Sequence, residues 1–163
     1  MDKVLNLLSP EDLDPATGLT NHEKQLVENS WNLVKTDIKN HGVELFILYF
    51  TDFPEYQNFF PFRGIPLEEL RKSEKLRSHG VTVMYTIGAI IDNLRDPEVL
   101  MILLHKNALS HSPRGVKAKH YWDLKKAVMK LLRGGLGSEF TKETEAAWDK
   151  TLNVAFTVIV KAL

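Results

Sequence analysis

Residues Leu76–Leu94, with the sequence LRSHGVTVMYTIGAIIDNL, are the stretch that decides the fold of this chain. Large apolar side chains return in it every three or four positions, which places them on one face of an amphipathic helix. His79 lies in line with this face, near the start of the stretch. The pattern predicts a long central helix, from about Pro66 to Leu94, that packs against the core and carries a histidine beside it. The predicted face consists of Leu76, His79, Val83, Ile87, Ile90, Ile91 and Leu94.

Other segments repeat the helical period on both sides of this stretch. Thr20 and Glu23 form a T-x-x-E capping box, which predicts the start of the first helix. The pair Gly134-Gly135 predicts the end of the penultimate helix. No segment alternates polar and apolar residues with a period of two, so we expect an all-α protein. Further helices are expected at about Thr36–Thr51, from Asp96-Pro97 to before Pro113, at Lys117–Arg133 and from Thr141 to the C-terminus.

The composition excludes several classes of function. The chain has 163 residues, which is enough for one domain with a substantial core. Its 21 basic and 21 acidic side chains balance, so no net field favours nucleic acid or an anionic membrane, and we expect neither as a partner. Cysteine is absent, which excludes disulfides, thiolate metal sites and cysteine nucleophiles.

The two ends of the chain differ in character. Residues 1–18 hold Pro10 and Pro15 and show no sustained period, so we expect a flexible N-terminal extension before a single domain of residues 19–163. The N-terminus lacks the long apolar core of a secretory signal. The longest uncharged run, Ser78–Ile91, is shorter than the ~18 residues that a membrane span requires. We therefore expect a soluble, cytoplasmic protein.

Two of the six histidines differ from the others because they continue apolar helix faces. These are His79 and His111, whereas the other four have no partner motif and are expected to be structural or exposed. Either residue alone is more typical of a core histidine than of a ligand. Together, on two helices, they fit a haem, which requires an apolar slot, a nitrogen donor on one side and a polar group on the other. A non-haem metal would require further ligands, and no HExxH or suitably spaced carboxylate supplies them.

Motifs along the chain match one family in order and spacing. Trp31 stands near the end of the first helix, and Trp148 stands in the last. The remaining matches are Gly42, Gly80, Pro54, Phe60, the segment His79-Gly80-Val81-Thr82-Val83, the segment Leu109-Ser110-His111, and Arg114-Gly115-Val116. From Leu19 to Leu163 the chain resembles the globins, and FFPFRGIPLEEL and SHSPRGV resemble intracellular globins of invertebrates in particular. The resemblance implies a globin fold of about seven helices around a haem pocket, with little or no fourth (D) helix.

The resemblance also implies a cofactor and roles for named residues. The cofactor is heme b (iron protoporphyrin IX), with His111 as the proximal iron ligand and His79 as the distal residue and candidate sixth ligand. Arg114 is expected to pair with a haem propionate, with an exposed loop arginine as the alternative. Asn107 departs from the family, which usually places an apolar residue there, so the proximal side remains open. The other implied contacts are Phe60 at the haem edge, Phe46 and Val83 on the distal side, and Val116, Tyr121 and Leu124 on the proximal side.

Two functions follow from the resemblance, and the sequence leaves both open. The first is reversible binding of dioxygen for storage or transport, without enzymatic activity. The alternative is a hexacoordinate, bis-histidyl globin that acts in redox chemistry, nitric oxide dioxygenation, nitrite reduction or oxygen sensing. A globin-like domain without haem is a third class, which the presence of His79, His111 and Phe60 argues against. We expect dioxygen, carbon monoxide and nitric oxide as ligands, and a monomer or homodimer.

Overall fold

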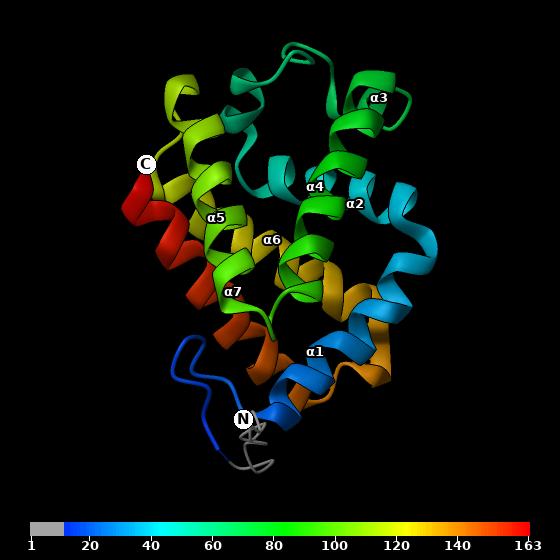
Figure 1. The fold of residues 1–163 in the computed structure, drawn as a ribbon. Coiled ribbons are helices and arrows are strands. Elements are labelled where there is room, and N and C mark those ends of the chain that lie inside the picture. The colour runs from blue at the N-terminus through cyan, green and yellow to red at the C-terminus, as the bar shows by residue number, and fades with distance from the viewer. Residues whose placement is uncertain (1–11) are drawn as a thin grey trace.

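Seven α-helices make up most of residues 12–163, the part of the chain that the computed structural model describes (Figure 1). This range contains no strand, and only an isolated backbone bridge joins Leu13 to Thr20. The predicted all-α fold is therefore confirmed. The α-helices are α1 (Asn21–Val34), α2 (Ile38–Asp52), α3 (Leu67–Leu70), α4 (Glu74–Asp92), α5 (Pro97–His111), α6 (Ala118–Leu136) and α7 (Lys142–Ala162). Four 3-10 helices connect them, namely η1 (Lys35–Asp37), η2 (Pro54–Phe59), η3 (Ser112–Arg114) and η4 (Gly137–Glu139).

The helices pack in crossed pairs around one apolar core. In Figure 1, α4 and α5 run side by side in front of α6, and α2 crosses α4. This crossing is unusually close, because a Cβ built on Gly42 would lie 2.6 Å from the carbonyl carbon of Gly80. Only glycine at both positions allows the two backbones to approach in this way. None of the helices in the described range is long and apolar enough to cross a membrane.

The core contains the helix faces that the sequence predicts. On α1 and α7, Trp31 and Trp148 are buried with ring centroids 6.1 Å apart, and Trp148 Nε1 donates to Ser30 Oγ at 2.8 Å. On α4, the large aliphatic side chains of the predicted face are buried, and His79 and Val83 are partly buried. The period of the deciding stretch therefore identified the inward face of its helix.

The prediction of one helix from Pro66 to Leu94 is wrong, because the structure divides this range into α3 and α4. Ser73 has an extended backbone (φ −71°, ψ 119°), and its hydroxyl accepts a hydrogen bond from the Leu76 N–H at 3.3 Å. It therefore caps a new helix instead of continuing the preceding one. What remains before it, α3, is a single turn of four residues.

The predicted end of the penultimate helix at Gly134-Gly135 is also wrong. α6 continues through both glycines to Leu136, and its C-cap is Gly137, with a positive φ of 53°. Gly135 lies against His41, since a Cβ built there would be 3.4 Å from the Nε2 atom of that histidine. The small size of Gly135 allows α6 to pass closely beside α2, so this glycine serves packing and does not end the helix.

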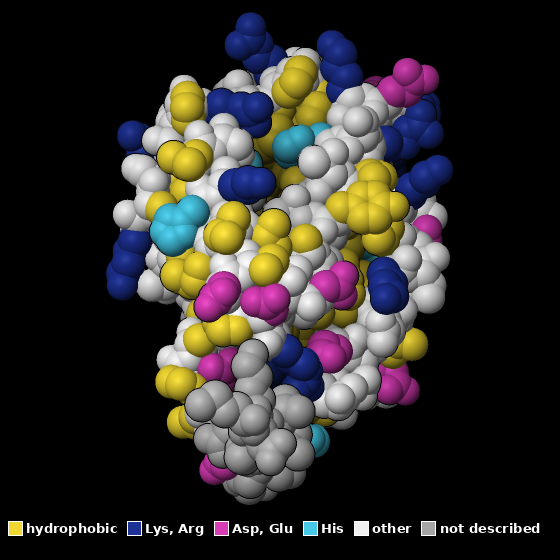
Figure 2. Space-filling view, in the orientation of Figure 1, with side chains coloured by type: hydrophobic (Ala, Val, Ile, Leu, Met, Phe, Trp, Pro, Cys, Tyr) yellow, Lys and Arg dark blue, Asp and Glu magenta, His cyan; other side chains and the backbone are white. Residues whose placement is uncertain are grey.

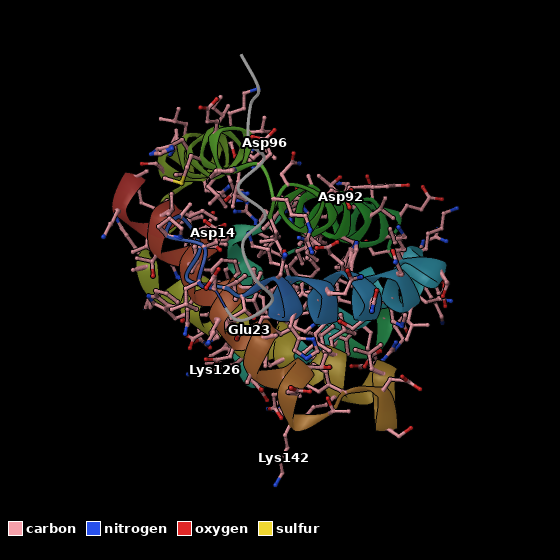
Figure 3. The ribbon with its side chains drawn as sticks, turned by 60° about the horizontal axis from the view of Figure 1, so that its bottom comes forward. Asp14, Glu23, Asp92, Asp96, Lys126 and Lys142 are labelled. Atoms are coloured by element: carbon pink, nitrogen blue, oxygen red, sulfur yellow. The ribbon has the colours of Figure 1, made fainter. Side chains whose placement is uncertain are left out.

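The segment before α1, in which Figure 3 labels Asp14, is attached to that helix by a shielded ion pair. Lys24 Nζ, on α1, lies 2.6 Å from Asp14 Oδ2, and both side chains are largely buried. Thr17 is also buried, and the capping box predicted for Thr20 and Glu23 is formed. Residues 12–18 of the predicted extension therefore contact the helical body, and the remainder of that extension lies outside the described residues.

Candidate functional site

A cavity of about 720 Å³ opens between α4 and α5 and extends to α2, η2 and α6. Figure 2 shows its mouth as a hollow that contains histidine and hydrophobic side chains, with Lys and Arg side chains near the rim. This volume is in the range of cofactor and small-ligand pockets. All residues that the sequence suggested for a haem site line this one cavity, namely Phe46, Phe60, His79, Val83, His111, Arg114, Val116, Tyr121 and Leu124.

His111, at the end of α5, has one ring nitrogen occupied and one available. Its Nδ1–H donates to the carbonyl oxygen of Asn107 at 2.8 Å, and Ser110 Oγ lies 3.0 Å from the same nitrogen. A neutral imidazole that donates through Nδ1 carries its lone pair on Nε2. His111 can therefore offer Nε2 as a metal ligand, with the ring orientation fixed from behind.

His79, on α4, is held among aromatic rings. The centroid of its ring lies 4.9 Å from that of Phe46 and 5.0 Å from that of Phe60, both in edge-to-face contact. Burial, with a smaller contribution from the charges of His111 and Arg114, lowers the pKa of His79 to about 4. The ring is therefore neutral at physiological pH, which allows it either to donate one hydrogen bond or to bind a metal.

The aromatic residues at the end of α2 and in the connection after it have two different roles. Phe50 and Phe62 are fully buried and belong to the core. Phe60 is only partly buried, stacks on Phe62 with centroids 5.1 Å apart, and presents its ring to the cavity. Some of these rings therefore fill the core, and others form part of the apolar wall of the cavity.

The wall beneath His111 contains a hydrogen-bonded polar pair. The hydroxyl of Tyr121 donates to Asn107 Oδ1 at 2.5 Å, and burial raises the pKa of Tyr121. The polar side chain of Asn107, which departs from the family pattern, thereby has its partner within the protein. Val116 and Leu124 complete this side of the cavity with apolar surface.

Two exposed arginines line the mouth of the cavity. Arg114 was expected there, and Arg63 was not singled out by the sequence. Arg63 follows the aromatic cluster directly, and this position in the FFPFR segment is the signal that could have identified it. The two guanidinium groups offer binding sites for two carboxylates of a ligand inside the cavity.

His120 also lines the cavity, although no sequence motif predicted this. Its Nδ1 accepts a hydrogen bond from the Lys117 N–H at 2.9 Å, so this histidine closes the first turn of α6. Its carbonyl oxygen accepts the hydroxyl of Tyr49 at 2.8 Å. Burial, assisted by Lys119, lowers the pKa of His120. Its place three residues after the N-cap Lys117 is the signal that could have identified this role.

The other three histidines lie outside the cavity. His22 Nε2 is 3.3 Å from Glu143 Oε1 at the surface. His41 and His105 each donate Nδ1–H to a backbone carbonyl of their own region of the chain. Among residues 12–163, no three His, Asp or Glu side chains gather in an arrangement that could hold a metal ion.

Comparisons with known proteins identify the family of this chain. The family model described as Globin matches residues 43–159. A globin of Nerita albicilla is 32% identical over 149 residues, which cover 91% of this chain and 95% of the relative. Globin-1 of Anadara inaequivalvis is 29% identical and covers 89% of this chain and 97% of its own length. A solved structure of the hexa-coordinate hemoglobin of Drosophila melanogaster superposes with a TM-score of 0.84 at 28% identity, over 89% of this chain and 95% of that one.

Proposed function

Because this chain belongs to the globin family of haem proteins, we propose that its cavity holds haem b, with His111 as the axial ligand, and that the protein binds dioxygen reversibly for storage or transport. The observation that carries the proposal is a pair of histidines from two helices, His79 on α4 and His111 on α5, that line one cavity together with the rings of Phe46 and Phe60. His111 has its Nδ1–H engaged by Asn107, and His79 is neutral among phenylalanine rings.

The residues present fit this cofactor. The aromatic rings of Phe46 and Phe60 provide the apolar wall, and His111 Nε2 provides the nitrogen donor. Arg63 and Arg114 stand at the mouth, where they can pair with the two propionates. When bound, haem supplies an iron that binds diatomic gases.

His79 gives the site its preference among such gases. Where haem is present, the neutral imidazole of His79 would donate one hydrogen bond to a gas ligand that carries partial negative charge, as dioxygen would, and would stabilise it selectively. Carbon monoxide carries little of this charge and gains less. A hydrogen bond to a charged group is worth about 1.5–3 kcal/mol, which corresponds to roughly tenfold to a hundredfold in affinity. Phe46 and Val83, which line the cavity with His79, would restrict the access of water to the bound gas.

The alternative is that His79 itself is a second axial ligand. The description of the Drosophila relative as hexa-coordinate favours it, and the neutral state of His79 is compatible with it. A gas would then have to displace a side chain, and its apparent affinity would fall by the fraction of open sites. Such a protein suits redox chemistry, nitric oxide dioxygenation, nitrite reduction or oxygen sensing.

Hemin titration and one visible spectrum test both functions. The purified chain should bind added hemin, and His111→Ala should bind it far more weakly. In the dithionite-reduced protein without gas, one broad visible band indicates an open site, and two sharp bands indicate that His79 is bound. In the second case His79→Leu should remove the sharp pair. A chain that takes up no hemin, or a His111→Ala variant that holds it as firmly as the wild type, would refute the proposal.

A further inference from the structure

A polar pair joins α5 to α6 beside the ring of His111. The Tyr121 hydroxyl, on α6, donates to the Asn107 side-chain oxygen, on α5, at 2.5 Å. Tyr121 is only 6% exposed, so its hydroxyl depends on a partner from the protein. Between α5 and α6, both of which lie wholly within the described residues, no other hydrogen bond is formed. α5 packs chiefly against α7, so this bond is its polar connection to α6.

The same asparagine holds His111 through its main chain. The Asn107 carbonyl oxygen accepts the Nδ1–H of His111 at 2.8 Å and the hydroxyl of Ser110 at 2.9 Å. The Tyr121 ring meets the His111 ring edge to face, with centroids 5.9 Å apart. Asn107 therefore connects the tyrosine on one side with the imidazole on the other.

Filling this wall of the cavity does not by itself require a polar pair. Two apolar side chains at positions 107 and 121 would cover a similar surface without the cost of burying a hydroxyl and an amide. What the pair adds is direction, because a hydrogen bond requires a set distance and angle. The last turn of α5 is thereby held in one position relative to α6.

We propose that Tyr121 and Asn107 are positioning residues for His111, and that their hydrogen bond sets the tilt at which the imidazole enters the cavity. The inference rests on the proposed function, in which His111 is the axial ligand. Without the bond, residues 107–111 can shift relative to α6, and the ring takes a range of tilts. Loss of an outer partner of a metal-binding histidine typically costs about tenfold to a hundredfold in metal affinity.

Two variants test the bond from its two ends. Tyr121→Phe removes only the hydroxyl, and Asn107→Leu removes the acceptor while keeping the backbone carbonyl that holds His111. For the hemin-reconstituted full chain, the rate of hemin loss to an excess of acceptor apoprotein and the iron–histidine stretching band after photolysis of carbon monoxide are measured. Each variant should lose hemin roughly tenfold faster and show a shifted, broader band. The double variant should show little further change, because both substitutions remove the same bond.

Two controls separate positioning from a general loss of stability. Ser30→Ala removes the partner of Trp148 Nε1, a bond between α1 and α7 outside the cavity, and should leave the band in place. In His111→Gly with imidazole added in solution, the ligand is no longer attached to α5. In that background Tyr121→Phe should no longer shift the band.

The outcomes distinguish this inference from the proposed function. A band that does not shift in either variant, or a shift that persists in the His111→Gly background, would overturn the positioning role while leaving the haem site intact. A wild-type chain that takes up no hemin would overturn both.

Discussion

The low pKa of His79 predicts that gas binding by the reconstituted protein does not change as the solution is acidified from pH 8 to about pH 5. Burial first, and then the charges of His111 and Arg114, lower this pKa from 6.5 to about 4. At pH 5, roughly 10% of such a ring is protonated, compared with about 97% of an unperturbed histidine. Protonation places a charge in an apolar cavity, so the charged ring turns out towards water. The distal function should therefore be lost only near pH 4.

The rate constant for carbon monoxide binding after flash photolysis reports this transition. Between pH 8 and pH 5 the wild-type rate constant should be flat, with a step at or below about pH 4 if the fold, monitored by circular dichroism, persists there. His79→Leu should show no such step, because the leucine side chain at position 79 does not titrate. A step with a midpoint near pH 6.5 that disappears in His79→Leu would refute the reasoning, because it would mean that the imidazole is hydrated.

Two further substitution experiments address the stability of the fold. A Cβ on Gly42 would lie 2.6 Å from the carbonyl carbon of Gly80, so Gly42→Ala should cost about 1–3 kcal/mol and lower the Tm by roughly 2–12 °C in calorimetry. A Cβ on the helical Gly134 meets no atom within 4 Å, so Gly134→Ala is the matched control and should raise the Tm by about 2–4 °C; equal effects of the two would contradict the close crossing. Lys24→Met strands the carboxylate of Asp14 in a shielded site and should lower the free energy of unfolding in urea by about 3 kcal/mol. Adding Asp14→Asn should restore part of that loss, and a loss below about 0.5 kcal/mol in the single variant would mean that water reaches the pair.

Helix faces could be predicted because the spacing of apolar residues within one continuous segment defines them. Ile87 and Ile91 repeat at the interval of one helical turn, and both are buried. The break before α4 could not be predicted in this way, because a serine is tolerated inside a helix and also caps one. Ser73 acts as a cap because the turn before it packs on the core through Leu70, which is fully buried. The end of α6 was wrongly predicted at Gly134-Gly135 for a similar reason. Gly135 is required for its small size, because His41 of α2 packs against it.

In the cavity lining, too, residues within sequence motifs could be predicted, and contacts between different helices could not. His79, His111 and Phe60 could be named because they stand in ordered motifs. The bond between Asn107 and Tyr121 could not, because the two residues are on different helices and their directions depend on how α5 and α6 meet. Sequence reasoning recognised Asn107 only as a departure from the family, and its partner became identifiable once the helices were in place.

The close crossing of α2 and α4 at Gly42 and Gly80 limits how His79 can move. Gly80 directly follows His79, and its backbone touches that of Gly42, so this point of α4 acts as a fulcrum. If α4 tilts about this contact, each residue moves in proportion to its distance from Gly80. Asp92, at the far end of α4, lies about 18 Å from Gly80 at 1.5 Å per residue. The far end can therefore swing while the Cα atom of His79 stays nearly still. Such a swing leaves the backbone of His79 in place, so the imidazole then extends further into the cavity only through its own χ torsions, at the cost of a rotamer and not of the helix packing.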